Sequence, residues 1–334
     1  MPKKSSAKKN NARSARSSRS SSKSPIKLAA QAAGAPKSSL GKWVSAARVR
    51  TLGLAVAPVA LGTGVAALSQ SENWLYAGLA LLVALSLQIG VNYANDYSDG
   101  IRGTDAVRVG PFRLTASKTV KASSVRNVAF AFFGLAAIAG LVLVVQTQLW
   151  WLLAVGAVAI VAAWFYTGGK KPYGYAGFGE VVTFFFFGPI AVFGTALVQY
   201  SDLFSDTWIP LAALGGAVGL GFLASAVLLV NNLRDIETDA AVGKRTLSVR
   251  VGKQASQWIF SALVASAIVL LIPYPFFYNG TIFSLASVFF LPPTILIVFT
   301  YRHPRELVTA LKVLSAGATI YGLLLGYGLF SLFL

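Results

Sequence analysis

Long stretches without any Asp, Glu, Lys or Arg are the feature that most limits how this chain can fold. A helix that spans a bilayer needs about 20 consecutive apolar residues. The chain has seven such uncharged stretches, and each of them is at least 21 residues long. The two longest each have room for two helices, because polar residues at 146–148 interrupt one and prolines and a glycine at 273–280 interrupt the other. We therefore expect an all-α membrane protein with nine transmembrane helices, drawn from 51–71, 73–95, 127–169, 181–201, 207–233, 254–301 and 313–334.

The composition agrees with this fold class. Only 12% of the 334 residues are charged and 55% are hydrophobic, whereas soluble domains carry about 25% charged residues. The apolar content excludes a chain that is disordered throughout, and the absence of cysteine excludes a disulfide scaffold. The formal net charge of +18 is compatible with a nucleic-acid partner, so the position of the charges decides what it means.

The first 50 residues hold 13 of the 29 Lys and Arg residues and no acidic residue. Residues 1–40 form a basic tail rich in Ser, Lys and Arg without apolar periodicity, which we expect to be disordered, and residues 41–334 form the membrane domain. Three roles suit such a tail: attraction to anionic lipid headgroups, an organelle transit peptide, or nucleic-acid binding. It has no aromatic residue and precedes membrane segments, so we favour the lipid surface or simple solvation and expect no nucleic-acid partner.

The loops between the nine segments divide by charge. Loops on one side would be the tail and 96–126, 170–180, 234–253 and 302–312, which carry 13, 6, 2, 5 and 3 Lys and Arg residues, all 29 in the chain. The loops on the opposite side carry none. Because Lys and Arg concentrate in cytoplasmic loops, we expect a cytoplasmic N-terminus and a C-terminus outside.

Two clusters of Asn and Asp lie at the cytoplasmic ends of the second and sixth helices. In the first, Asn92, Asp96 and Asp99 are four and three residues apart and share one helix face, and Asn95 and Asp105 lie nearby. Carboxylates are costly in a bilayer, so such residues face a cavity or a partner.

The second cluster repeats the pattern, because Asn231, Asp235 and Asp239 are spaced by four residues. Two such stripes facing each other would offer hard oxygen donors that suit Mg²⁺, which carboxylates and phosphate oxygens commonly hold together. The simpler interpretation is that these acids are solvated and paired with nearby Arg and Lys residues; two matching clusters in a chain with 11 acidic residues argue against it.

A third element combines aromatic and basic residues on the same side, with Tyr166 four residues before Lys170. Arg113, Lys244 and Arg245 add further positive charges there. A metal together with cations suggests a polyanionic substrate such as a diphosphate, although lysines at 170 and 171 taken alone are typical of ordinary anchoring at the cytoplasmic surface.

Together these motifs resemble those of UbiA-type membrane prenyltransferases, over roughly residues 45–334. The branch that acts on 1,4-dihydroxy-2-naphthoate in menaquinone synthesis is the most similar, on the sequences NDYSDGIRGTD from Asn95, KKPYGY from Lys170 and NNLRDIETDAAVGKRTLSVRVG from Asn231. Two positions depart from the family pattern: Gly103 stands where a third Asp is usual, and Val49 replaces a proline.

The resemblance implies a Mg²⁺-dependent prenyl transfer at a bacterial inner membrane, with a polyprenyl diphosphate and an aromatic acid as substrates. Two Mg²⁺ ions would bridge the diphosphate, held by Asp96, Asp99, Asp235 and Asp239. Lys170 would help to stabilise the leaving group, and Tyr166 would stabilise an allylic cation. Residues expected to contact the substrates are Asn92, Asn95, Asp105, Arg113, Asn231 and Lys244, with Arg48 or Arg50 holding the acceptor carboxylate.

Two alternatives remain open at this stage. A prenyltransferase of the same family could use another aromatic acceptor, such as a hydroxybenzoate or homogentisate. A polytopic cation-coupled transporter would belong to a different class, and it predicts carboxylates near the bilayer midplane and an inverted repeat. No pattern in the sequence indicates an oligomeric state.

Overall fold

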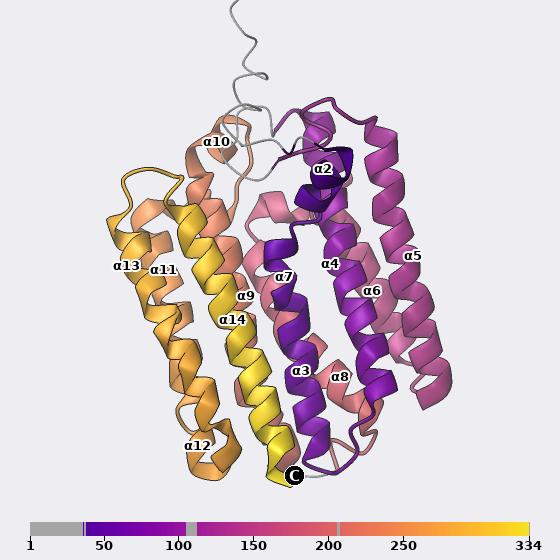
Figure 1. The fold of residues 1–334 in the computed structure, drawn as a ribbon. Coiled ribbons are helices and arrows are strands. Elements are labelled where there is room, and N and C mark those ends of the chain that lie inside the picture. Colours follow the sequence, from indigo (N-terminus) through magenta and orange to yellow (C-terminus); the bar gives the residue numbers. More distant parts are fainter. Residues whose placement is uncertain (1–35, 37, 105–111, 206–207, 334) are drawn as a thin grey trace, which may run out of the picture.

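The computed structural model describes residues 36, 38–104, 112–205 and 208–333. These residues form an all-helical bundle in which the described chain contains no strand (Figure 1). The long helices are α4 (Trp74–Arg102), α5 (Ala122–Thr147), α9 (Trp208–Arg234), α11 (Leu247–Leu271) and α14 (Leu307–Phe330). The shorter ones are α2 (Ser39–Ala46), α3 (Gly53–Ala67), α6 (Leu152–Phe165), α7 (Gly179–Phe185), α8 (Ala191–Gln199), α10 (Ile236–Ala241), α12 (Tyr274–Phe277) and α13 (Leu291–Thr300).

Helices fall within each of the nine expected segments, but they differ in length. Among the described residues, seven helical spans are long and apolar enough to cross a bilayer, and one of them joins α7 and α8 through a π-helical turn at Phe186–Ile190. The first segment is a bent pair, Ser39–Thr51 and Gly53–Ala67, that turns by 46° and makes an eighth span if counted as one. α6 is apolar but has only 14 residues, so nine crossings stay a prediction.

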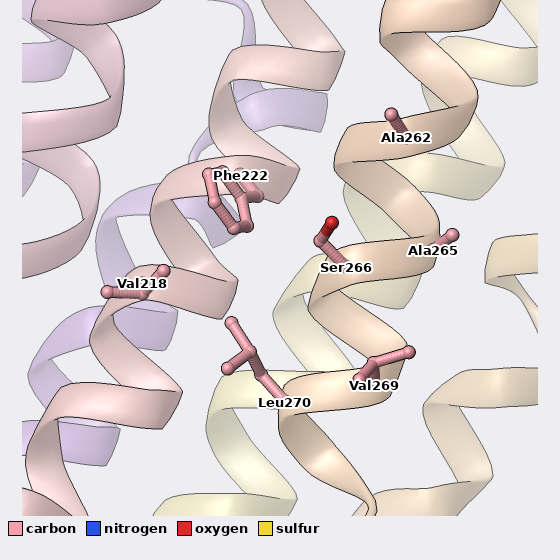
Figure 2. Close-up of a pocket in the computed structure, with 7 residues that line it drawn as sticks. All are labelled: Val218, Phe222, Ala262, Ala265, Ser266, Val269 and Leu270. Carbon is pink, nitrogen blue, oxygen red and sulfur yellow. The ribbon is translucent and has the colours of Figure 1, made fainter.

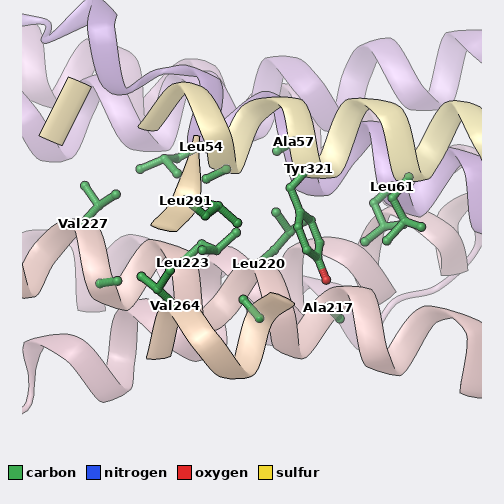
Figure 3. Packing of buried hydrophobic residues seen from close by; sticks show 14 of the residues in the cluster. Leu54, Ala57, Leu61, Ala217, Leu220, Leu223, Val227, Val264, Leu291 and Tyr321 are labelled. Atoms are coloured by element: carbon green, nitrogen blue, oxygen red, sulfur yellow. The ribbon is translucent and has the colours of Figure 1, made fainter. Parts of the chain in front are cut away.

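The core lies where α3, α9 and α14 pack together with α11 and α13. Leu61 and Leu223 are fully buried there, as is Tyr321 from α14. Figure 3 shows these side chains meeting between the helices, together with Leu54, Ala57, Ala217, Leu220, Val227, Val264 and Leu291.

Glycines let α3 and α14 approach closely. A Cβ atom added at Gly64 would lie 2.2 Å from the carbonyl oxygen of Gly326, and one added at Gly322 would lie 2.6 Å from the Cβ of Ala57. Small residues at such contacts are a common way to bring membrane helices together. The contact therefore requires glycine at these positions.

The ends of α4 and α9 and the starts of α5, α11 and α14 lie at one end of the bundle, and the C-terminus lies at the other (Figure 1). The basic loops are therefore grouped as the charge partition predicts. Which side of the membrane this end faces stays a prediction. The tail up to residue 35 lies outside the described residues.

Candidate active site

The last turns of α4 present Asp99 to the interior of the bundle end. Asp99 is 3% exposed and its side chain accepts a hydrogen bond of 2.6 Å from the Tyr175 hydroxyl. Its other oxygen accepts one of 3.3 Å from the Lys244 ammonium. α4 ends at Gly103, whose φ of +75° is the left-handed conformation that glycine adopts without strain. An aspartate at this position, as in the wider family pattern, would be strained.

Lys244 connects the two acidic clusters. Its ammonium nitrogen lies 3.3 Å from Asp99 of α4 and 3.9 Å from Asp239 of α10, and the side chain is almost fully buried. It also lies 4.6 Å from the centroid of the Tyr175 ring, within the range of a cation–π contact. The structure thus brings Asp99 and Asp239 around one positive charge, although 140 residues separate them along the chain.

Tyr175 lies in a short 3₁₀ turn, Tyr173–Ala176. Burial raises the pKa of Tyr175, and the negative charge of Asp99 raises it further. The hydroxyl therefore stays protonated and acts as a donor to the carboxylate. Tyr175 belongs to the KKPYGY motif, but sequence reasoning did not single it out, because its position in this loop has no spacing that predicts a contact.

The second cluster lies at a corner between two helices. α9 ends at Arg234 and α10 begins at Ile236, yet the N–H of Asp239 still donates to the carbonyl of Asp235, which preserves the helical spacing. Asp235 accepts two hydrogen bonds, of 2.8 and 2.6 Å, from the guanidinium of Arg234. The Asn231 amide donates to the Val227 carbonyl within α9.

The polar residues of α4 share one helix face, as their spacing predicts, but their side chains bond to different neighbouring segments. Asn92 donates to the carbonyl of Ala47, next to the bend before α3. Both oxygens of the fully buried Asp96 accept backbone N–H groups, from Leu114 at 2.9 Å and Thr115 at 2.8 Å. Asn92 and Asp96 therefore anchor neighbouring backbone segments. Their ligand roles stay predictions.

Asn95 and Asp99, one helical turn apart, bond to the segment that follows α6. Asn95 accepts a hydrogen bond of 2.8 Å from the Thr167 hydroxyl, just after α6. Arg102 donates to the carbonyls of Thr167 and Gly169, so the loop is bound to α4 on both sides. Lys170 lies at the exposed edge of this loop, and in the described part of the chain it forms no ion pair with an acidic residue.

Tyr166 lies close to the start of α7, where sequence reasoning missed a buried carboxylate, Glu180. Burial and the negative charge of Glu180, ahead of that of Asp99, raise the pKa of Tyr166, while Arg48 lowers it. Glu180 of α7 accepts a hydrogen bond of 2.7 Å from the Asn232 amide of α9. The available signal was the position of Glu180 directly before a stretch without charged residues.

The other residues predicted to contact the substrates differ in how exposed they are. Arg48 has a φ of +56° at the bend before α3, and its charge reaches Tyr166. A proline at 49 would disfavour this conformation of residue 48, so Val49 is compatible with it. Arg50 is exposed and Arg113 is partly exposed. Asp105 lies outside the described residues.

The residues present fit a divalent metal that is held jointly with a diphosphate. Asp99 and Asp239 supply hard, buried carboxylate oxygens around a common centre. Within the described residues, no three acidic, His or Cys side chains could hold a metal by themselves. Mg²⁺ sites commonly use one or two carboxylates and leave the remaining positions to substrate phosphates and water.

A separate hollow of about 480 Å³ lies between α9 and α11 (Figure 2). Val218 and Phe222 line it from α9, and Ser266 is the one polar side chain among its seven lining residues. Phe222 is 12 residues before the end of α9, which is roughly 18 Å along the helix axis. This groove suits a hydrocarbon chain and not a diphosphate.

Comparisons with known proteins agree with this arrangement. Residues 55–331 match the model of the UbiA prenyltransferase family. The 1,4-dihydroxy-2-naphthoate octaprenyltransferase of Mycobacterium tuberculosis is 53% identical over 232 residues, which cover 70% of this chain and 77% of that protein. The protein of the same name from Escherichia coli is 34% identical over 301 residues, covering 86% and 94% of the two chains.

A solved structure has a similar fold. The UbiA homologue from Archaeoglobus fulgidus bound to DMAPP and Mg²⁺ has a TM-score of 0.59 and 15% identity, and the match covers 87% of this chain and 99% of that one. At this identity the likeness shows the shared fold.

Proposed function

Because this chain belongs to the UbiA prenyltransferase family and is an intramembrane prenyltransferase, we propose that it transfers a polyprenyl group from a polyprenyl diphosphate to 1,4-dihydroxy-2-naphthoate. The product would be a prenylated naphthoquinol, the reduced form of demethylmenaquinone. The observation that carries this proposal is Lys244, placed between Asp99 and Asp239 where a diphosphate and its metal would be bound.

Mg²⁺ would be held by Asp99 and Asp239, with Asp235 beside them at the α9–α10 corner. When bound, the metal would neutralise the charge that develops on the departing diphosphate. Lys244 would contact the diphosphate directly, and the neutral hydroxyl of Tyr175 would keep Asp99 oriented through their hydrogen bond. Asp96 would contribute by fixing the segment around Leu114 and Thr115 against α4. The structurally similar UbiA homologue that was solved with DMAPP and Mg²⁺ supports the assignment of a prenyl diphosphate and Mg²⁺ to this site.

The bond between the allylic carbon and the diphosphate oxygen breaks, and its electron pair leaves with the diphosphate. The Tyr166 ring would stabilise the allylic cation by a cation–π interaction, worth about 2 kcal/mol when desolvated. The ring carbon that bears the carboxylate forms the new C–C bond, and the carboxylate leaves as CO₂. The electron pair of the broken C–CO₂ bond restores the aromatic ring, so no additional base is required.

Arg48 would hold the acceptor carboxylate before this step. Arg48 is partly buried at the bend before α3, whereas Arg50 is exposed. Of the two arginines expected from the sequence, Arg48 is therefore the one we assign. The bacterial relatives also support a location in the inner membrane.

The test is mass spectrometry of the lipid product formed by the purified protein with a polyprenyl diphosphate and Mg²⁺. We expect a prenylated naphthoquinol that lacks the carboxyl group when 1,4-dihydroxy-2-naphthoate is the acceptor. Chelation with EDTA should abolish the product, and added Mg²⁺ should restore it. 4-Hydroxybenzoate and homogentisate serve as competing acceptors: a product from one of these alone would show that the acceptor assignment is wrong, and turnover unaffected by EDTA would exclude the metal.

A further inference from the structure

Glu180 is a buried carboxylate with only one of its oxygens engaged. The residue is 6% exposed. Its Oε1 accepts the 2.7 Å hydrogen bond from Asn232, whereas Oε2 has no hydrogen-bond partner among the described residues. A buried carboxylate oxygen without a donor is unfavourable. A bound ligand with a free donor would therefore complete this group.

The surroundings of Glu180 hold it in place. The Ser225 hydroxyl donates to the backbone carbonyl of Glu180 at 2.7 Å, and the Asn232 amide donates to the Glu180 side chain. Two separate hydrogen bonds therefore hold this end of α7 against α9. A rigidly held acceptor oxygen can orient a ligand with little loss of conformational entropy.

Glu180 also lies beside Tyr166. A Cβ atom added at the preceding residue, Gly179, would lie 3.3 Å from the Tyr166 hydroxyl and 3.1 Å from Leu228. The negative charge of Glu180 is the largest charge effect on the Tyr166 hydroxyl, which agrees with this proximity. Asn232, its partner, is two residues before the end of α9 at Arg234, and Asp235 follows at the α9–α10 corner. The carboxylate is therefore next to the proposed reaction centre but outside the two acidic clusters.

We infer that Glu180 accepts a hydrogen bond from the 4-hydroxyl of the aromatic acceptor and so positions the ring beside Tyr166, an inference that rests on the proposed function. The 1-hydroxyl is adjacent to the acceptor carboxylate and bonds to it internally, which leaves the 4-hydroxyl as the free donor. The proton stays on the hydroxyl oxygen. The hydrogen bond to a negative group raises the electron density of the ring, which favours attack on the allylic cation. Arg48 would bind the carboxylate at the opposite end of the acceptor.

The variant E180Q tests this role, because glutamine keeps the size of the side chain and an oxygen for Asn232 but removes the charge. S225A is the matched control, since it removes the other hydrogen bond between α7 and α9. In detergent-purified protein with Mg²⁺ and polyprenyl diphosphate, E180Q should raise KM for 1,4-dihydroxy-2-naphthoate on the order of 10- to 100-fold. KM for the diphosphate should stay unchanged. S225A should leave both KM values unchanged.

A second readout uses 1-hydroxy-2-naphthoate, which lacks the 4-hydroxyl, as a competitive inhibitor. Its inhibition constant should be the same in wild type and E180Q. An unchanged KM for the acceptor in E180Q would overturn the inference. Equal weakening of acceptor and inhibitor binding in E180Q would also overturn it, and so would a similar rise of the acceptor KM in S225A. Either result would indicate a structural role for Glu180. If the wild type prenylates no dihydroxynaphthoate, the proposed function fails, and the inference fails with it.

Discussion

Asp96 and Asp99 show how the position of a side chain on a helix decides its role. Both are buried aspartates in the same turn of α4. Asp96 points to the backbone N–H groups of Leu114 and Thr115, whereas Asp99 points to Tyr175 and Lys244. Three residues correspond to about 300° of rotation around a helix, which leaves the two side chains about 60° apart on the same face. This difference in direction is enough to bring them to different neighbouring segments.

This difference predicts separate effects for the two asparagine variants. D99N should lower prenyl transfer on the order of 100-fold or more, because it removes a charge from the diphosphate-binding centre. D96N should destabilise the fold by about 1.5–3 kcal/mol, since an amide oxygen replaces only one of two charged acceptors for the backbone N–H groups. Activity assays measure the loss of prenyl transfer in both variants, and thermal unfolding measures the loss of stability. A loss of activity in folded D96N as large as that in D99N would contradict the separation.

At the level of elements, the contact between α3 and α14 shows how closely two membrane helices can approach. Glycines on α14 meet the backbone of α3 directly, and a Cβ atom at Gly326 would lie 2.4 Å from the carbonyl oxygen of Ala60. Backbone cannot move aside as a flexible side chain can. The pairing of α3 with α14 therefore depends on residues without side chains.

The variant G326A should destabilise the bundle by about 1–3 kcal/mol, the usual cost of overpacking a close contact. G134A is the control, because a Cβ atom there, in the middle of α5, meets nothing within 4 Å. This control should be neutral or stabilising by up to about 1 kcal/mol through helix propensity. Denaturation in detergent compares the two; a G326A protein as stable as wild type would show that α3 and α14 can separate at little cost.

Across the whole molecule, the acidic clusters, Lys244 and the basic loops occupy the same end of the bundle (Figure 1). The acidic residues that bind metal and diphosphate in our proposal are thus surrounded by the positive charges of the loops. This favours delivery of a water-soluble, anionic headgroup from one side of the membrane. It also places the carboxylates at helix ends, whereas the transporter alternative requires them near the midplane.

Reporter fusions test the orientation. With nine crossings and the basic loops in the cytoplasm, a C-terminal reporter that functions only in the cytoplasm should be inactive, and an N-terminal one should be active. The result depends on whether the 14-residue α6 crosses the membrane. An active C-terminal reporter would show an even number of crossings, and α6 would be the first segment to reconsider.

The sequence by itself determined the membrane class, the positions of the helices and the end of the bundle that carries the site. These follow from hydrophobicity and charge, which act on each segment independently of the other segments. Motif spacing also identified Asp99 and Asp239 as candidates, and the charge partition added Lys244. The spacing within α4 did not show which segments Asn92, Asp96, Asn95 and Asp99 contact, because those contacts depend on which elements pack against the helix.

Only the tertiary structure decided which of these residues meet. Lys244 between Asp99 and Asp239, Tyr175 on Asp99, and Glu180 with Asn232 beside Tyr166 all join elements far apart in the chain. The physical reason is that a side-chain contact depends on the packing of several helices at once, and glycine contacts such as Gly64 with Gly326 fix that packing. No local pattern encodes such a contact, so Glu180 could be recognised only after the helices were in place.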